Sequence, residues 1–150
     1  MNKKYFFFIA TICIQFITLK PTFICEDLSE QKPGNTRTFK GLNFSMNKAG
    51  HAMAVWAVTD PVTAVGGAIQ AAYFNGTSWE KPATADTFIS DTTKASCLPW
   101  VHLNDNDQAI VVWHQTDDNI VRANRFVGGT WETTTGEDVA SLDGGPDFGL

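Results

Sequence analysis

The stretch AMAVWAVTD at residues 52–60 returns as AIVVWHQTD at residues 109–117, with the tryptophan and the Thr-Asp pair in the same places. The likeness continues toward the N-terminus, where FSMNKAGHAMAVW at 44–56 aligns with VHLNDNDQAIVVW at 101–113 at an offset of 57 residues. Matches at fixed spacing over this many positions predict an internal repeat.

Toward the C-terminus the repeat continues at a shorter offset. AIQAAYFNGTSWE at 68–80 aligns with IVRANRFVGGTWE at 120–132, an offset of 52 residues. The difference falls in the connecting segment, where AVTDPVTAVGG is longer than its counterpart HQTDDN, as is typical of a surface loop. The identical pairs include Asn47 and Asn104, Ala52 and Ala109, Val55 and Val112, Trp56 and Trp113, Ala71 and Ala123, Phe74 and Phe126, Gly76 and Gly128, and Trp79 and Trp131.

Each unit is predicted to consist of short strands joined by tight turns. AMAVWAV and AIVVWHQ are rich in Val, Ile and Trp, while MNKAGH and NDNDQ carry the Asn, Asp and Gly of turns. In the first unit we expect strands near residues 42–47, 52–58, 67–74 and 78–83, and no segment after the N-terminal run has a helical stripe. The predicted fold is all-β, with antiparallel four-stranded blade repeats that form a partial β-propeller after an N-terminal signal helix.

Two patterns within the strands predict which side chains are buried. Alternation along AIQAAYF places Ile69, Ala71 and Tyr73 on one face of the sheet, and the residues between them on the other. Trp56 and Trp113 lie in the most apolar strands, so we expect both in the core, where they would pack blade against blade.

Residues 1–25 are predicted to be an export signal. MNKK is a short basic start, and the run from Tyr5 to Leu19 is uncharged and almost wholly apolar. This run is shorter than the roughly 20 residues of a membrane span and suits a secretory signal. Three alternatives stay open: ordinary cleavage nearby, lipidation of Cys25 as in a bacterial lipoprotein, or an uncleaved signal that acts as an anchor. The protein is thus expected to be exported, as a secreted, periplasmic or cell-surface protein, with membrane contact only through the signal or a lipidated Cys25.

The rest of the chain divides into three parts. Residues 26–40 are a polar linker, residues 41–97 the first blade-like repeat, and residues 98–149 the second. GPDFGL at 145–150 aligns with TKASCL at 93–98, so a third unit would start at the C-terminus. A closed propeller needs about four to eight blades, so the chain is either a fragment of a longer propeller or a homo-oligomer in which several copies complete one ring.

Charge and cysteine content exclude two classes of protein. Without Lys3, Lys4 and Lys20 of the signal, the chain keeps 11 − 3 = 8 basic residues against 16 acidic ones, a net charge of about −8. Such a surface repels a phosphate backbone, so we expect no nucleic-acid partner. Cys97 is the cysteine that lies clearly outside the signal, which excludes a disulfide scaffold. We expect it to be a small buried residue; a bridge to Cys25 is the open alternative.

The order of the parts in each unit resembles the blades of bacterial sialidase-like and lectin-like propellers. GGTW at 128–131 also resembles the end of the Asp-box turn, S-x-D-x-G-x-T-W, but the serine and aspartate that open that motif are absent. The resemblance implies blade architecture over about 110 residues. A sialidase would further bring an arginine cluster, a tyrosine nucleophile and acidic partners. Arg122 and Arg125 fall on opposite faces of one strand, so we expect no hydrolase activity and no enzyme.

Other residue types that could support chemistry lack a motif. His51, His102 and His114 have no carboxylate or second histidine at a catalytic or metal-ligand spacing. NDND at 104–107 hints at a calcium loop but lacks the expected glycine and glutamate, so a hairpin turn is the stronger interpretation. We therefore expect neither a metal nor another cofactor.

The tryptophans are the candidate ligand-binding residues. Trp79 and Trp131 follow turns, where an aromatic face either stacks on a sugar ring or locks the hairpin, and Trp100 precedes the second unit and could line a groove. The predicted function is that of an exported, non-catalytic binding module for a glycan or a protein ligand. The alternative is an inactive remnant of a larger sialidase-like hydrolase or surface scaffold protein.

Overall fold

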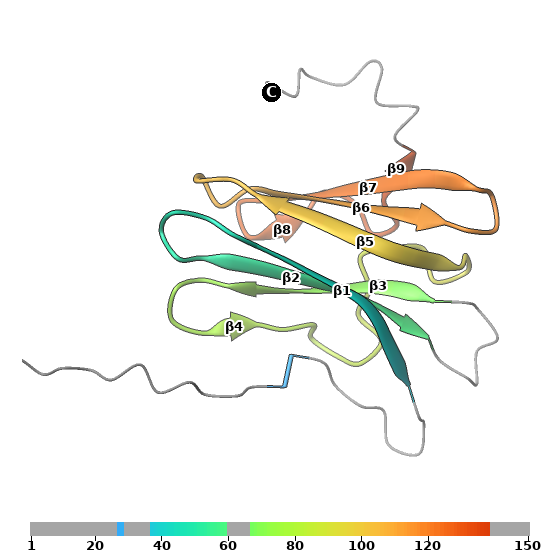
Figure 1. Cartoon of the computed structure of the whole chain (residues 1–150), viewed down its shortest axis with the longest axis horizontal. Helices are drawn as coiled ribbons and strands as arrows, with labels where there is room; N and C mark the ends of the chain where they lie inside the picture. Colours follow the sequence, from blue (N-terminus) through green and yellow to red (C-terminus); the bar gives the residue numbers. More distant parts are fainter. Residues whose placement is uncertain (1–26, 29–36, 60–66, 139–150) are drawn as a thin grey trace, which may run out of the picture.

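The computed structural model describes residues 27–28, 37–59 and 67–138, and within these ranges the chain forms two antiparallel sheets (Figure 1). The first sheet has the order β1-β2-β3-β4, with β1 (Thr38–Met46), β2 (Ala52–Thr59), β3 (Ala68–Phe74) and β4 (Trp79–Glu80). The second sheet has the order β5-β6-β7-β8, with β9 also pairing with β7; its strands are β5 (Ser96–Leu103), β6 (Ala109–Gln115), β7 (Ile120–Val127), β8 (Thr130–Trp131) and β9 (Glu137–Asp138). The prediction of an all-β, antiparallel chain is confirmed for the described residues.

Several predicted features lie outside the described residues. These are the signal at 1–25 with Cys25, most of the linker at 26–40, and the start of a third unit at 145–150. Across the described ranges, no helix is long and apolar enough to cross a membrane.

Two strands of the first sheet differ in length from the prediction. β1 begins at Thr38, not near 42, because Arg37 directly before it is anchored: its buried guanidinium donates hydrogen bonds to the Ala85 carbonyl and to the Asp86 carboxylate. β4 ends at Glu80, short of the predicted 83, because Pro82 has no N–H to extend a ladder.

The two units share backbone irregularities at repeat-equivalent positions. The pairing of β1 with β2 shifts register between Lys40 and Asn43, and that of β5 with β6 shifts between Cys97 and Trp100, again at an offset of 57. Residues with positive φ also recur in pairs: Gly41 (63°) and Leu98 (53°), Gly50 (83°) and Asp107 (60°), Gly76 (88°) and Gly128 (60°). A positive φ is uncommon for leucine. Leu98 nevertheless has the same backbone conformation as its counterpart Gly41, so the second unit keeps the bulge of the first even without a glycine.

The first hairpin turn is also built identically in both units. The Asn47 N–H donates to the His51 carbonyl over 3.0 Å, and the Asn104 N–H donates to the Gln108 carbonyl over 2.9 Å. Each asparagine side-chain oxygen accepts two backbone N–H groups, from Ala49 and His51 in the first turn and from Asn106 and Gln108 in the second. The sequence NDND is therefore a hairpin turn of the same kind as its counterpart.

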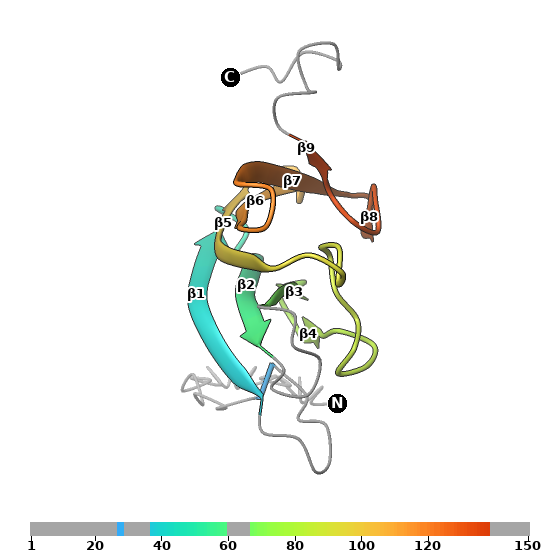
Figure 2. The same cartoon turned by 90° about the vertical axis from the view of Figure 1, so that its right-hand side faces the viewer.

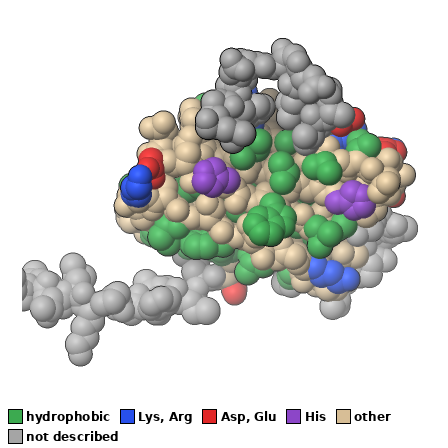
Figure 3. Space-filling view, turned by 45° about the horizontal axis from the view of Figure 1, so that its top comes forward, with side chains coloured by type: hydrophobic (Ala, Val, Ile, Leu, Met, Phe, Trp, Pro, Cys, Tyr) green, Lys and Arg blue, Asp and Glu red, His purple; other side chains and the backbone are tan. Residues whose placement is uncertain are grey.

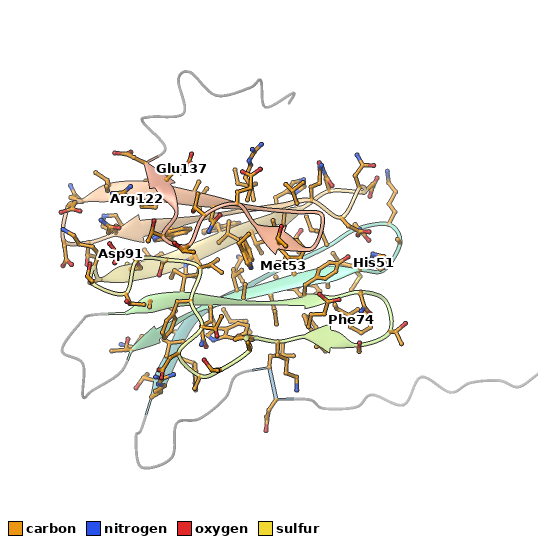
Figure 4. The ribbon with its side chains drawn as sticks, turned by 180° about the vertical axis from the view of Figure 1, so that it is seen from behind. His51, Met53, Phe74, Asp91, Arg122 and Glu137 are labelled. Atoms are coloured by element: carbon orange, nitrogen blue, oxygen red, sulfur yellow. The ribbon has the colours of Figure 1, made fainter. Side chains whose placement is uncertain are left out.

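The main core lies between the two sheets, which stack face to face (Figure 2). Met53 lies between them in the side-chain view (Figure 4). The buried members of this core are Met53, Val55, Ala57 and Ile69 from the first sheet, Val101, Leu103, Ala109, Val111, Trp113 and Phe126 from the second, and Ile89 from the segment between them. The predicted alternation in β3 is confirmed, because Ile69, Ala71 and Tyr73 all face this core.

We call the two facing surfaces the inner faces of the sheets and the opposite surfaces the outer faces. The inner face of the second sheet is the repeat equivalent of the outer face of the first: Val101 and Leu103 correspond to Phe44 and Met46, and Trp113 corresponds to Trp56. The sheets therefore stack in one sense, head to tail, so that unlike faces meet.

This arrangement separates the two core tryptophans. Trp113 is 1% exposed and packs between the sheets, as predicted. Trp56 is also buried, but on the outer face of the first sheet, in a second cluster with Ala54, Val58 and Ala72. The expectation that it packs sheet against sheet is wrong, because the first sheet has no described sheet on that side; Leu28 and Phe39 are among the side chains packed there.

The buried indole N–H groups have different surroundings in the two units. Trp56 Nε1 donates to Gln70 Oε1 over 3.1 Å, whereas Trp113 Nε1 has no hydrogen-bond partner among the described residues. The residue that pairs with Trp113 across the strands is Arg122, the counterpart of Gln70, and a guanidinium carries donors only.

Replacing this arginine is expected to stabilise the protein. Arg122→Gln supplies an acceptor to Trp113 Nε1 and removes a buried Nε that has no hydrogen-bond partner in the described part of the chain, so we expect the free energy of unfolding to rise by about 1 kcal/mol in urea titrations. Arg125→Gln on the same strand is the control, and it should lower stability slightly because Arg125 pairs with Glu132. A fall in stability for Arg122→Gln would contradict the prediction.

Candidate functional site

A cleft of about 210 Å³ opens between the two sheets, where the β3–β4 and β7–β8 hairpins approach each other. Its apolar lining includes Met53, Tyr73, Phe126 and Trp131, and residues 81–83 also line it. We call it the aromatic cleft. Its volume lies below the roughly 300–1,000 Å³ of sites for drug-sized ligands, so it suits a small group such as a single ring.

Aromatic rings form a continuous ladder along the cleft. Tyr73 of the first sheet contacts Phe126 of the second with ring centroids 5.2 Å apart, and Phe126 contacts Trp131 at 5.3 Å. His51 meets Tyr73 edge to face at 6.2 Å (its place at the turn end is labelled in Figure 4). Aromatic pairs are stable in tilted and edge-to-face arrangements at these distances, so the contacts hold the rings in place.

His51, at the end of this row of aromatic rings, contacts the turn of the second unit. His51 Nδ1 lies 2.7 Å from Asp107 Oδ1 and 3.2 Å from the Tyr73 hydroxyl, and Asn47 Nδ2 donates to Asp107 over 2.7 Å. The hydrogen bond from His51 lowers the pKa of Asp107, so this carboxyl is ionised at neutral pH. Burial, reinforced by the Asp107 charge, raises the pKa of the Tyr73 hydroxyl, which therefore stays protonated and able to donate.

Polar groups border the apolar floor of the cleft. Glu80 at the end of β4, Lys81 after it and Thr87 all line the cleft. Glu80 also accepts a hydrogen bond from Asn75 Nδ2 over 3.1 Å, which fixes its carboxylate at the hairpin. Aromatic faces beside donors and acceptors match the chemistry of a sugar ring, whose C–H face packs on an aromatic side chain while its hydroxyl groups bond polar neighbours.

The three predicted ligand-binding tryptophans lie in three different places. Trp131 lines the aromatic cleft. Trp79 packs against Phe74, with ring centroids 5.4 Å apart, on the outer face of the first sheet. Trp100 is 66% exposed on the outer face of the second sheet. Trp79 and Trp131 occupy equivalent hairpins, and both cover the phenylalanine of the preceding strand.

The structure adds residues that sequence reasoning missed. The sequence placed Tyr73 on a face of its strand but assigned it no binding role. His51 had no carboxylate at a recognised spacing, yet Asp107 lies beside it. The repeat could have predicted this contact. If two units stack in register, the turn at 47–51 must lie beside the turn at 104–108. Lys48 and Asp105 of the same turns meet at 2.7 Å for this reason.

The other candidate residues have structural partners. His114 Nε2 lies 3.0 Å from Asn119 Oδ1, and its Nδ1 lies 3.9 Å from the Sγ of Cys97, which is only partly buried. Arg125 forms a bidentate pair with Glu132. Among the described residues no three His, Cys, Asp or Glu side chains are grouped so as to hold a metal ion.

Comparison with known proteins gives no match: no protein-family model, no curated protein and no solved structure is significantly similar to this chain.

Proposed function

We propose that this chain is an exported, non-catalytic binding module of β-propeller type that binds a glycan in the aromatic cleft. The observation that carries the proposal is the position of Trp131. Of two tryptophans that lock equivalent hairpins, this one borders a concave site with a tyrosine, a second aromatic ring and charged neighbours.

The blade assignment is supported by the repeat of the bulges, turns and positive-φ residues at fixed offsets. It is further supported by the head-to-tail stacking of the two sheets, since successive propeller blades also stack with unlike faces in contact. In this assignment the ligand lies between neighbouring blades and contacts side chains of both.

The ligand class follows from the lining. One sugar ring fits the volume of the cleft better than a peptide segment would, and Trp131 offers it an aromatic surface. The Glu80, Lys81 and Thr87 side chains line the cleft and carry donors and acceptors for sugar hydroxyl groups.

The test uses Trp131 and its repeat-equivalent Trp79 as a matched pair. A glycan array with the purified protein identifies the ligand, and calorimetric titration then gives the dissociation constant for each variant. We expect Trp131→Ala to weaken binding tenfold or more, about 1.4 kcal/mol. Trp79→Ala removes the same residue from the equivalent hairpin but leaves the cleft intact, so its affinity should stay within about twofold of wild type.

Two results would count against the proposal. The first is a wild-type protein that binds no glycan on the array. The second is an equal loss of affinity in both variants, which would mean that hairpin locking, and not contact with the ligand, matters. Thermal unfolding of both variants checks that any difference in binding does not come from a difference in folding.

A further inference from the structure

The large hydrophobic side chains that are exposed in the described part of the chain form two sets of three, with Leu42, Phe44 and Met46 on the first sheet and Leu98, Trp100 and Val121 on the second. The cross-strand pairing places Phe44, Met46, Trp100 and Val121 on the outer faces, and Leu42 and Leu98 lie at the two bulges. Figure 3 shows apolar side chains spread between two histidines on the side of the molecule formed by the second sheet. Exposed apolar residues gathered in this way mark an interaction surface.

The contact between the inner faces shows how such surfaces pair. Side chains of β1 cap the open edge of β5: Asn43 Oδ1 accepts the Val101 N–H over 3.2 Å, and Ser45 Oγ accepts the Leu103 N–H over 3.0 Å. The apolar side chains of Val101 and Leu103 enter the core between the sheets. In this contact the inner face of the first sheet supplies the capping residues of β1, and the inner face of the second sheet supplies the strand β5 that they cap.

The repeat places the same two kinds of face on the outside. On the second sheet, Trp100 and His102 are the equivalents of Asn43 and Ser45. On the first sheet, Phe44 and Met46 are the equivalents of Val101 and Leu103. The outer faces therefore correspond, position by position, to the two halves of the contact already made inside the chain.

We propose that a second copy of this chain docks head to tail, with the outer face of its first sheet on the outer face of the second sheet. Repeating the internal contact once more brings Trp100 against Phe44 of the second copy and His102 against Met46 of the second copy. A histidine ring nitrogen can accept a backbone N–H as Ser45 does, and the Trp-Phe pair replaces a polar cap with aromatic contact.

The charges at the proposed interface and the exposure of its side chains are both compatible with this contact. Asp105 would lie near Lys48 of the second copy, as it lies near Lys48 within the chain, so unlike charges meet. On the first sheet, Trp56 is already covered by side chains that include Leu28 and Phe39, whereas Phe44 and Met46 are 52% and 57% exposed. The docking surface is therefore the β1 side of that face.

Because unlike faces meet, the interface is heterologous, and repeated docking gives a closed ring or an open chain of copies. The proposal does not rest on glycan binding, since the aromatic cleft lies between the inner faces and uses other residues.

The test combines two variants, each with one face blocked, in size-exclusion chromatography with light scattering. Phe44→Glu and Trp100→Glu change exposed side chains, so both variants should fold. Wild type is expected to be oligomeric and each variant alone monomeric. An equimolar mixture should form a 1:1 dimer, because each variant keeps the face that the other has lost and the two glutamates prevent further growth.

Thr77→Glu, at the exposed tip of the β3–β4 hairpin, is the matched control and should leave the wild-type mass unchanged. A monomeric wild type at high micromolar concentration would overturn the proposal. So would association that persists in both single variants, since it would use other surfaces, or a mixture that stays monomeric.

Discussion

Trp113→Ala is expected to lower the free energy of unfolding by about 3–5 kcal/mol, enough to leave a marginally stable domain largely unfolded. Trp113 is 1% exposed and is the largest fully buried side chain of the described residues. It packs between the sheets among Met53, Val55 and other core residues, so truncation opens a cavity where the two sheets meet. The loss therefore affects the contact that holds both units in register.

Urea titration followed by far-ultraviolet circular dichroism measures this loss. Both changes are compared in the Phe44→Glu background, where the proposed docking is blocked, and Trp100→Ala is the matched control because it removes the same residue type at a 66% exposed position. Its effect on stability should stay within about 0.5 kcal/mol. If Trp113→Ala lowers the free energy of unfolding no more than Trp100→Ala does, the core between the sheets is not the main source of stability.

Gly136→Ala is expected to cost several kcal/mol, although it adds a single methyl group. Gly136 has φ of +76°, where a non-glycine residue loses roughly 1–2 kcal/mol. Its added Cβ would also overlap the six-membered ring of Trp113, a side chain that is fully packed and cannot move aside. Overpacking of this kind adds roughly 1–3 kcal/mol.

Gly50→Ala separates the two contributions in the same urea titration. Gly50 has φ of +83°, but a Cβ there meets no atom within 4 Å, so only the backbone cost applies. The difference between the two variants measures the overlap with Trp113. Equal losses would mean that the segment carrying Gly136 can shift away from the core.

The candidate site was only partly predictable. The position of Trp131 after a turn marked it as a ligand-binding candidate, and it does line the aromatic cleft. Trp79 carries the same local signal and lies elsewhere, because the environment of a hairpin depends on which sheet covers it. Asp107 meets His51 only because two turns stack side by side, whereas Tyr73 reaches His51 within the first sheet.

The sequence by itself determined the all-β class, the bounds of β2 and β3 to within one residue, the hairpin turns and the repeat. These depend on local patterns: alternation, β-branched and aromatic residues, and turn residues that recur at fixed offsets. Only the tertiary structure decided that the units stack head to tail, that Trp113 enters the main core while Trp56 does not, and where a cleft remains. The two tryptophans have similar local sequences, and burial depends on the surface that packs against a residue, which local sequence does not encode.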